Sequence, residues 1–249
     1  MGRLTALDLL RVALRTPLLQ ATWNYERQQG LGWAWCFQPV LERLYPDAAE
    51  RRRRLADHTA YFNTQPTLAS LALGAVAGLE ERNAENGAGD ESVARAKSVL
   101  GSALAALGDR LFWATLRPFA AVLGVIVALG TGSWQGAAVF WVVYNGVHLA
   151  LRFAGVAWGY RRGPGILDDA LRRRFDRMVR WLSVLGAALV GVAIAAVLVP
   201  NGEPRELSFQ AALLGGLALG LVTAIRARPS PTQWALGVGA LCLVAGWWR

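Results

Sequence analysis

Apolar and polar residues form separate blocks along the chain, and the lengths of the apolar blocks predict a helical membrane protein. The stretches 181–199, 207–225 and 233–248 carry no charged residue. At 1.5 Å of rise per residue, the first of them reaches about 28 Å, which is enough to cross a bilayer. We therefore predict an all-α polytopic membrane protein whose last part, 166–249, consists of transmembrane helices.

A break divides the long uncharged block 119–151. Its only basic residue is His148, and the sequence Gly-Thr-Gly-Ser at 130–133 interrupts it. Glycine and serine clusters are typical of turns between helices. The block fits either a short half-helix followed by a full span or a re-entrant pair, and the sequence leaves both open.

The preceding apolar blocks are shorter and have polar ends. Residues 1–60 interleave apolar residues with arginines and aromatic residues, as in amphipathic helices at a membrane surface. The apolar runs within 61–81 and 96–118 are shorter than the roughly 20 apolar residues that a span requires, and Gly108, Asp109 and Arg110 end the second run early. We predict interfacial helices over 1–60 and a core with re-entrant helical hairpins over 61–165. An ordinary turn leading into a core helix is the alternative for 61–81.

The charge distribution indicates an anionic lipid surface. The chain has 26 Lys and Arg against 17 Asp and Glu, a net charge of +9. Arginines flank the apolar blocks and no nucleic-acid-binding motif occurs, so we expect contact with anionic lipid and none with nucleic acid. The arginine-rich segment 152–180 should be cytoplasmic by the positive-inside rule. This topology places the N-terminus in the cytoplasm and the C-terminus on the periplasmic or extracellular side.

Common catalytic and cofactor motifs do not occur in the sequence. There is no Walker loop, no GxGxxG after a strand, no HExxH and no paired CxxC. Cys36 and Cys242 lie in apolar surroundings, and His58 and His148 have no partner set in the sequence that indicates a triad. We interpret the histidines as structural and expect no catalytic residue, cofactor or metal in this chain.

Polar and ionisable side chains at the ends of apolar segments are the candidates for a binding site. Because such groups are costly at membrane depth, they are often functional. The candidates are Glu26, Asn63, Gln65, Asp109 and Arg117. A surface salt bridge for Glu26, and an interfacial ion pair of Asp109 with Arg110 or Arg117, are the structural alternatives.

Four sequence blocks together resemble a known family. They are LRTPLLQATWNYERQQGLG at 14–32, HTAYFNTQP with LGAVAGLEER at 58–66 and 73–82, LGDRLFWATLRP at 107–118, and YNGVHLALRFAGVAWGYRRG at 144–163. In order and spacing they resemble the IID subunit of the mannose/fructose/sorbose-type sugar phosphotransferase system (PTS). The similarity covers roughly residues 10–165.

The resemblance implies a bacterial inner-membrane subunit that pairs with a IIC membrane subunit to bind and move a hexose. Phospho-IIB, from the cytoplasmic IIA and IIB components, would phosphorylate the sugar, and this chain would carry no phosphorylated residue. IIC–IID pairs would form a higher oligomer. On matching motif positions, Glu26, Asn63, Gln65 and Asp109 would bind sugar hydroxyls, because carboxylates and amides can hold adjacent hydroxyls at two points. Arg117 and Pro66 would be structural or gating residues.

This sequence departs from the family pattern before Gly108. The family usually has Gly-Pro and a further Gly there, and a Pro after the Gly-Asp pair. Here those positions read Ser102, Ala103, Ala106 and Arg110. Fewer helix breakers predict a more continuous helix.

Two rivals to transport follow from the sequence. A degenerate IID-like subunit could serve as a scaffold or regulator without transport. A membrane enzyme acting on lipid-linked substrates could hold a metal at Asp168 and Asp169.

Overall fold

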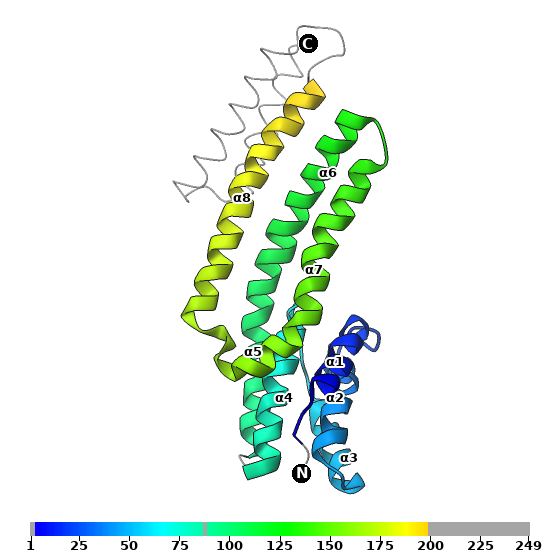
Figure 1. The fold of residues 1–249 in the computed structure, drawn as a ribbon, viewed down its shortest axis with the longest axis vertical. Coiled ribbons are helices and arrows are strands. Elements are labelled where there is room, and N and C mark those ends of the chain that lie inside the picture. Colours follow the sequence, from blue (N-terminus) through cyan, green and yellow to red (C-terminus); the bar gives the residue numbers. More distant parts are fainter. Residues whose placement is uncertain (1–2, 87–88, 199–249) are drawn as a thin grey trace. The chain divides into compact units, whose positions relative to one another are not determined.

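The structure is a computed structural model that describes residues 3–86 and 89–198 (Figure 1). The chain divides into two compact units, one of residues 1–114 with 141–176 and one of 115–140 with 177–249. The predicted spans at 207–225 and 233–248 lie outside the described residues. The predicted boundaries of the three regions, 1–60, 61–165 and 166–249, stay predictions.

The described residues are helical, and two isolated bridges are the only strand-like pairings among them. The helices are α1 (Ala6–Arg15), η1 (Thr16–Leu18), α2 (Gly30–Leu44), α3 (Ala48–His58), α4 (Ala69–Asn86), α5 (Asp90–Gly108), the π-helical η2 (Asp109–Leu116), α6 (Arg117–Thr131), α7 (Gln135–Arg162), η3 (Gly163–Leu167) and α8 (Asp169–Leu198). The predicted all-α class is confirmed, and α8 contains most of the predicted span 181–199.

In the first unit, α1 packs on α2, α2 on α3 and α4, and α4 on α5. A capping box begins α1: Thr5 accepts from the backbone N–H of Asp8, and the Asp8 carboxylate accepts from the backbone of Thr5. Trp33, Phe37 and Phe62 are fully buried and form the aromatic core between these helices. This core fixes the segment after α3, which carries the candidate site.

Helices α4 and α7 approach backbone to backbone through small residues. A Cβ atom added at Gly74 would lie 1.9 Å from the Val156 carbonyl oxygen, and one at Gly159 would lie 2.1 Å from the Leu71 carbonyl oxygen. Small residues let helix backbones approach this closely. The glycines of LGAVAGLEER and GVAWGY therefore have a packing role.

The helix continues past Gly108, as the missing helix breakers predict. Asp109 follows with helical dihedrals, φ −62° and ψ −42°, and η2 continues from α5 to α6. The segment has Ser102, Ala103 and Ala106 in place of helix breakers, which is why a continuous helix is expected here. The π-helical stretch ends directly before Arg117 and Pro118, and a widened turn accommodates a proline that lacks the N–H of a regular helix.

Two described helices are long and apolar enough to cross a membrane, Glu91–Thr131 and Gln135–Leu167. The predicted break between them is confirmed: Gly132 ends α6 in the left-handed conformation, with φ +62°. Within the second unit, Gly124 and Gly136 bring α6 close to the start of α7.

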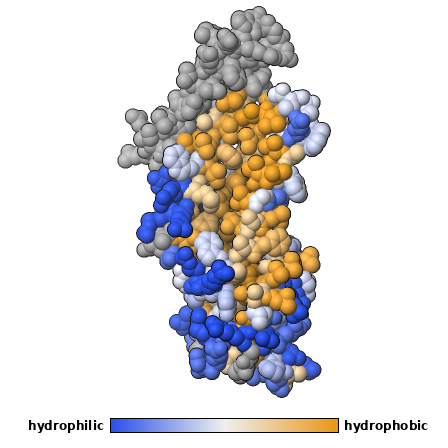
Figure 2. Space-filling view, in the orientation of Figure 1, coloured by the Kyte–Doolittle hydropathy of each residue, from blue (hydrophilic) through white to orange (hydrophobic). Residues whose placement is uncertain are grey.

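Surface hydropathy differs between regions of the chain. Hydrophobic residues cover the visible face of α6, whereas hydrophilic residues gather at the end of the first unit that contains α3 (Figure 2). Val125, Leu129 and Trp134 are exposed large apolar residues in this part of the second unit. Such a face suits lipid or a protein partner.

Candidate functional site

The loop before α2 is a tight turn that projects Glu26 outward. The Asn24 side chain accepts a hydrogen bond from the backbone N–H of Arg27 at 2.8 Å, and the Asn24 and Gln28 backbones pair with each other. Gln28 adopts φ +53° to close the turn. Glu26 is exposed and lies 3.9 Å from the Arg27 guanidinium. The sequence Trp-Asn-Tyr-Glu-Arg at 23–27 thus builds a turn that presents a carboxylate.

Gln29 connects this turn to the extended segment 61–65. Its Nε2 donates to the Thr64 carbonyl at 2.8 Å, and its Oε1 accepts from the Thr64 backbone N–H at 3.2 Å. The Phe62 carbonyl also accepts from the Gln29 backbone N–H at 2.8 Å. Gln29 is buried, and its side-chain amide satisfies the backbone N–H and C=O of Thr64 as a neighbouring strand would in a sheet.

The same segment runs along α5. Added Cβ atoms at Gly101 and Gly108 would lie 3.4 Å from the Asn63 carbonyl oxygen and 2.4 Å from the Gln65 Cβ, respectively. The rise from Gly101 to Gly108 is about 10 Å, and the extended residues from Asn63 to Gln65 run beside this part of the helix. Asn63 therefore lies beside Gly101, and Gln65 lies beside Gly108.

Gln65 begins α4. Its Oε1 accepts from the backbone N–H groups of Thr67, at 2.8 Å, and Leu68, at 3.1 Å, and its Nε2 donates to the Thr67 hydroxyl. Pro66 occupies the first position of the turn that leads into α4, where its missing N–H costs nothing. Gln65 is buried, so capping the helix occupies its side-chain oxygen.

The structure places four of the predicted residues along one strip, which consists of the loop before α2, the extended segment 61–65 and the neighbouring helix around Gly108. Glu26 lies at the loop that pairs with residue 62, Asn63 and Gln65 are on the extended segment, and Asp109 follows Gly108 on the neighbouring helix. Glu26, Asn63 and Asp109 are exposed. Arg117 begins α6 in the second unit and is exposed there.

Asp109 is followed by an arginine that has a different partner. The Arg110 guanidinium contacts the Asp176 carboxylate at 2.8 Å. The ion pair that Arg110 forms is therefore with Asp176 and does not require Asp109.

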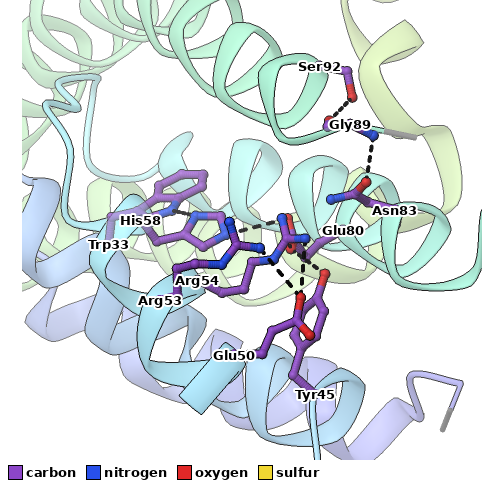
Figure 3. Close-up of polar contacts among 10 residues, drawn as sticks. All are labelled: Trp33, Tyr45, Glu50, Arg53, Arg54, His58, Glu80, Asn83, Gly89 and Ser92. Carbon is purple, nitrogen blue, oxygen red and sulfur yellow. Dashed lines mark hydrogen bonds and ion pairs between the residues drawn. The ribbon is translucent and has the colours of Figure 1, made fainter. Parts of the chain in front are cut away.

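A buried carboxylate, Glu80 on α4, contacts two side chains of α3 and the residue that follows α2 (Figure 3). Its Oε1 accepts from the Tyr45 hydroxyl at 2.7 Å and lies 3.7 Å from an Arg54 Nη1, and its Oε2 lies 3.6 Å from the His58 Nε2. Burial alone would raise the pKa of Glu80. The neighbouring donors His58, Tyr45 and Arg54 outweigh burial and lower this pKa, so the carboxylate is ionised.

His58 is held as a neutral imidazole. The Trp33 indole N–H donates to the His58 Nδ1 at 3.2 Å, and because indole can only donate, Nδ1 must be unprotonated. The remaining proton is then on Nε2, facing Glu80. Burial lowers the pKa of His58 and outweighs the attraction of the nearby carboxylate.

A second polar cluster involves α7. The Thr67 hydroxyl and the His148 Nδ1 lie 2.7 Å apart, and the Arg152 guanidinium donates to the Thr16 carbonyl at 2.8 Å. The His148 ring stacks on Tyr144 and meets Phe112 edge-on. Thr16, His148 and Arg152, which belong to the first and fourth sequence blocks, therefore lie in polar contacts of the first unit.

An open cavity of about 830 Å³ lies beside Glu80 in the first unit. Its wall includes Glu26, His58, Glu80 and Lys97. Among the described residues no group of three His, Cys, Asp or Glu side chains could hold a metal. Asp168 accepts from the Leu171 backbone N–H at 2.8 Å, which is the geometry of a helix N-cap rather than a ligand set.

Comparison with known proteins decides the family. The chain matches the model of the "PTS system mannose/fructose/sorbose family IID component" over residues 3–222. The chain belongs to this family. The predicted family is confirmed, and with it the assignment as a membrane-embedded permease subunit rather than a catalytic enzyme.

Relatives and solved structures agree with this assignment. The IID chain is 38% identical over 195 residues to the mannose-specific EIID component of Escherichia coli (strain K12), covering 77% of this chain and 68% of the relative. It is 35% identical over 193 residues to the sorbose-specific EIID component of Klebsiella pneumoniae, covering 77% and 70%.

A cryo-EM structure of the mannose transporter ManYZ in complex with microcin E492 matches 99% of this chain and 97% of its own, with 29% identity and a TM-score of 0.62. A second solved structure, of a membrane protein, matches with 30% identity and a TM-score of 0.72, covering 99% of this chain and 97% of that one.

Sequence reasoning about the IID chain missed several residues that organise the site. Gln29 and Glu80 were treated as parts of motifs without a role, and His58 was assigned no partners. Their partners lie 25 to 35 residues away along the chain. The sequence feature that indicates them is a pair of adjacent polar residues at the edge of an apolar run, Gln28-Gln29 and Glu80-Glu81.

Proposed function

We propose that this chain is the IID subunit of a PTS permease that pairs with a IIC subunit to bind and translocate a hexose. Phospho-IIB would phosphorylate the sugar, with no phosphorylated residue in this chain. The family match over residues 3–222 carries the proposal. The relatives are named as mannose-, sorbose- and fructose-specific components, which supports a hexose or related sugar as substrate.

The proposed sugar-binding site is the strip along the extended segment 61–65. Glu26, Asn63 and Asp109 are exposed there and offer carboxylate and amide groups to sugar hydroxyls. Gln65 contributes its second Nε2 hydrogen and positions the segment by capping α4. Arg117 and Pro66 have structural or gating roles. A site that hydrogen-bonds a sugar hydroxyl is selective, because a sugar analogue that lacks this hydroxyl leaves the protein's polar group unpaired.

The proposed setting is a bacterial inner membrane. The N-terminus faces the cytoplasm and the C-terminus the periplasm or exterior, and arginines near the surface contact anionic lipid. IIC–IID pairs assemble into a higher oligomer, and the IIA and IIB components act from the cytoplasm.

Sugar binding by the co-purified IIC–IID pair tests the site. We expect Glu26→Ala and Asn63→Ala each to weaken hexose affinity about tenfold, since one lost hydrogen bond to a polar ligand costs about 1.4 kcal/mol. Glu85→Ala, at an exposed position outside the strip, should leave affinity unchanged. Unchanged affinity in both site variants would remove these residues from the site.

A scaffold or regulatory subunit without transport is the second candidate. The uninterrupted helix Glu91–Thr131, formed where the family usually has helix breakers, favours it. Co-purification with IIC without sugar binding or uptake would support this alternative. Sugar uptake that requires the IID chain would exclude it.

A further inference from the structure

Arg152 is a buried arginine inside a helix that is long and apolar enough to cross a membrane. It lies on α7, within the stretch Gln135–Leu167, and is 7% exposed. Arg162, at the end of α7, follows it by about 15 Å of helix, which is half of the roughly 30 Å thickness of the hydrocarbon layer. A charge at this depth is costly, and ionisable residues that persist there are functional by default.

The guanidinium of Arg152 is anchored by a backbone carbonyl. Its Nη1 donates to the Thr16 carbonyl oxygen at 2.8 Å, whereas its buried Nε has no hydrogen-bond partner in the described part of the chain. None of the described carboxylates lies within 4.0 Å of this guanidinium. The bond to Thr16 is therefore the contact that compensates the buried charge in the described structure.

Thr16 suits this role because it ends α1. Its carbonyl oxygen also accepts from the Leu19 backbone N–H at 3.1 Å, and a carbonyl has two lone pairs, so both bonds can form. The C-terminal end of a helix carries a partial negative charge, which favours a cation beside it. The end of α1 thus supplies the negative potential that a carboxylate would otherwise supply.

The chain leads from Thr16 directly to the turn that presents Glu26. Leu19 follows η1 and lies with its backbone against the start of α2, because a Cβ atom added at Gly32 would overlap the Leu19 carbonyl oxygen. The two ends of the segment 19–32 are therefore held together, and Glu26 lies between them. A shift of the end of α1 would move the Glu26 turn with it.

The same face of α7 also holds the other arm of the strip. His148 lies one helical turn before Arg152, and its Nδ1 is 2.7 Å from the Thr67 hydroxyl. The Thr67 backbone N–H donates to the Gln65 side chain, at the end of the extended segment. The two α7 residues thus fix the turn and the extended segment to one helix.

We propose that Arg152 is a positioning residue for sugar binding: it holds the end of α1, and with it the Glu26 turn, without touching the sugar. The inference rests on the proposed function, in which Glu26 binds a sugar hydroxyl. Because Arg152 acts through Glu26, removing Arg152 costs no more affinity than removing Glu26.

A double-mutant cycle on the co-purified IIC–IID pair tests the inference, with mannose, fructose and sorbose as probes. We expect Arg152→Met to weaken the binding of the best probe about fivefold, below the roughly tenfold effect of Glu26→Ala. In a Glu26→Ala background, Arg152→Met should change affinity less than about twofold, because coupled residues have non-additive effects. Arg161→Met, an exposed position on the same helix, should leave affinity unchanged.

A conservative variant distinguishes the bond to Thr16 from bulk at this position. Arg152→Lys keeps the charge and an N–H donor of similar reach, and the contact is a single hydrogen bond rather than a bidentate pair. We expect its affinity to stay within about twofold of wild type. A loss as large as that of Arg152→Met would overturn the assigned bond.

Hydrogen–deuterium exchange measures the hold on the turn without any sugar. The backbone N–H groups of Arg27 and Gln28 both bond to Asn24 within the turn, and exchange reports the opening of such bonds. We expect Arg152→Met to speed exchange in peptides covering 16–29 by roughly threefold or more and to leave peptides of α5 unchanged. Arg152→Gln, which also lacks the charge and is too short to reach Thr16, provides both measurements if Arg152→Met does not fold.

Two results would overturn the inference. One is unchanged exchange of 16–29 in a folded Arg152→Met or Arg152→Gln pair. The other is an equal loss of affinity with and without Glu26, which would mean that Arg152 binds the sugar itself or stabilises the chain as a whole.

The exchange measurement also separates this inference from the proposed function. A wild-type pair that binds no hexose would contradict the proposed function, and faster exchange of 16–29 in Arg152→Met would still identify Arg152 as the residue that holds the turn. Wild-type hexose affinity in Arg152→Met together with unchanged exchange would contradict only the inference.

Discussion

Two adjacent carboxylates, Glu80 and Glu81, show how single residues hold the first unit together. Consecutive side chains on a helix point about 100° apart. Glu80 accepts from Tyr45, whereas Glu81 accepts from the Leu4 backbone N–H at 2.6 Å and from the Tyr160 hydroxyl at 2.5 Å. The end of α4 thus connects the N-terminus, the end of α2 and α7. Both carboxylates are buried, so their hydrogen bonds are needed to offset desolvation.

His58 and Glu80 predict a dependence of stability on pH. The pKa of each is lowered in the folded chain, so the unfolded chain binds more protons below the unfolded pKa values, about 6.5 for His and 4.5 for Glu. Their stabilisation is complete above about pH 6.5 and is lost as the pH falls, first through His58 and then through Glu80. The loss is at most about 1.4 kcal/mol per pH unit for one proton.

We expect the melting temperature of the detergent-solubilised chain to fall between about pH 7 and pH 5.5. His58→Gln should flatten this part of the curve, because an amide can accept from Trp33 and donate toward Glu80 without titrating. A slope of the same size in the variant would show that other groups set the dependence.

At the level of helices, the packing of α4 on α7 depends on glycine. A methyl group at Gly159 would lie 2.1 Å from the Leu71 carbonyl oxygen and 2.9 Å from the Ala75 backbone nitrogen. Neither backbone atom can move away as a flexible side chain could. The two helices must then separate, which breaks the contacts that position Glu81 and Tyr160.

Gly159→Ala should therefore destabilise the chain by about 1–3 kcal/mol, the usual cost of overpacking. Gly146→Ala is a matched control on the same helix, because an added Cβ there meets nothing within 4 Å. Chemical or thermal unfolding of both variants in detergent measures the difference. Equal stability of the two variants would contradict a tight α4–α7 contact.

The sequence predicted helices better than it predicted their partners. The Gly-Thr-Gly-Ser cluster at 130–133 located the break near Gly132, and composition explained why the helix continues past Gly108. The partner of Gln29 is Thr64 and that of His58 is Trp33, and such long-range pairings leave no local periodicity. Gln65 was expected to bind sugar, and its helix-capping role follows only from the turn geometry at Pro66.

At the scale of the whole molecule, charge and helix length together predict topology. Helix α7 has 28 residues, more than the roughly 20 needed to cross a bilayer. The turn before it, at 132–134, has no charged residue, whereas arginines are frequent from Arg161 to Arg180. By the positive-inside rule, we expect the arginine-rich end to lie in the cytoplasm and the turn to lie on the opposite side.

Cysteine labelling checks this topology in a Cys242→Ala background. The remaining thiol, Cys36, is buried, and burial raises its pKa to about 12, so it should not react. We expect Ser133→Cys to react with a membrane-impermeant maleimide added outside intact spheroplasts, and Gly165→Cys to react only in inverted vesicles. Both positions are near element ends, and an added Cβ at Gly165 meets nothing within 4 Å. Labelling of both cysteines from the same side would mean that α7 does not cross the membrane, because a crossing helix must separate its two ends.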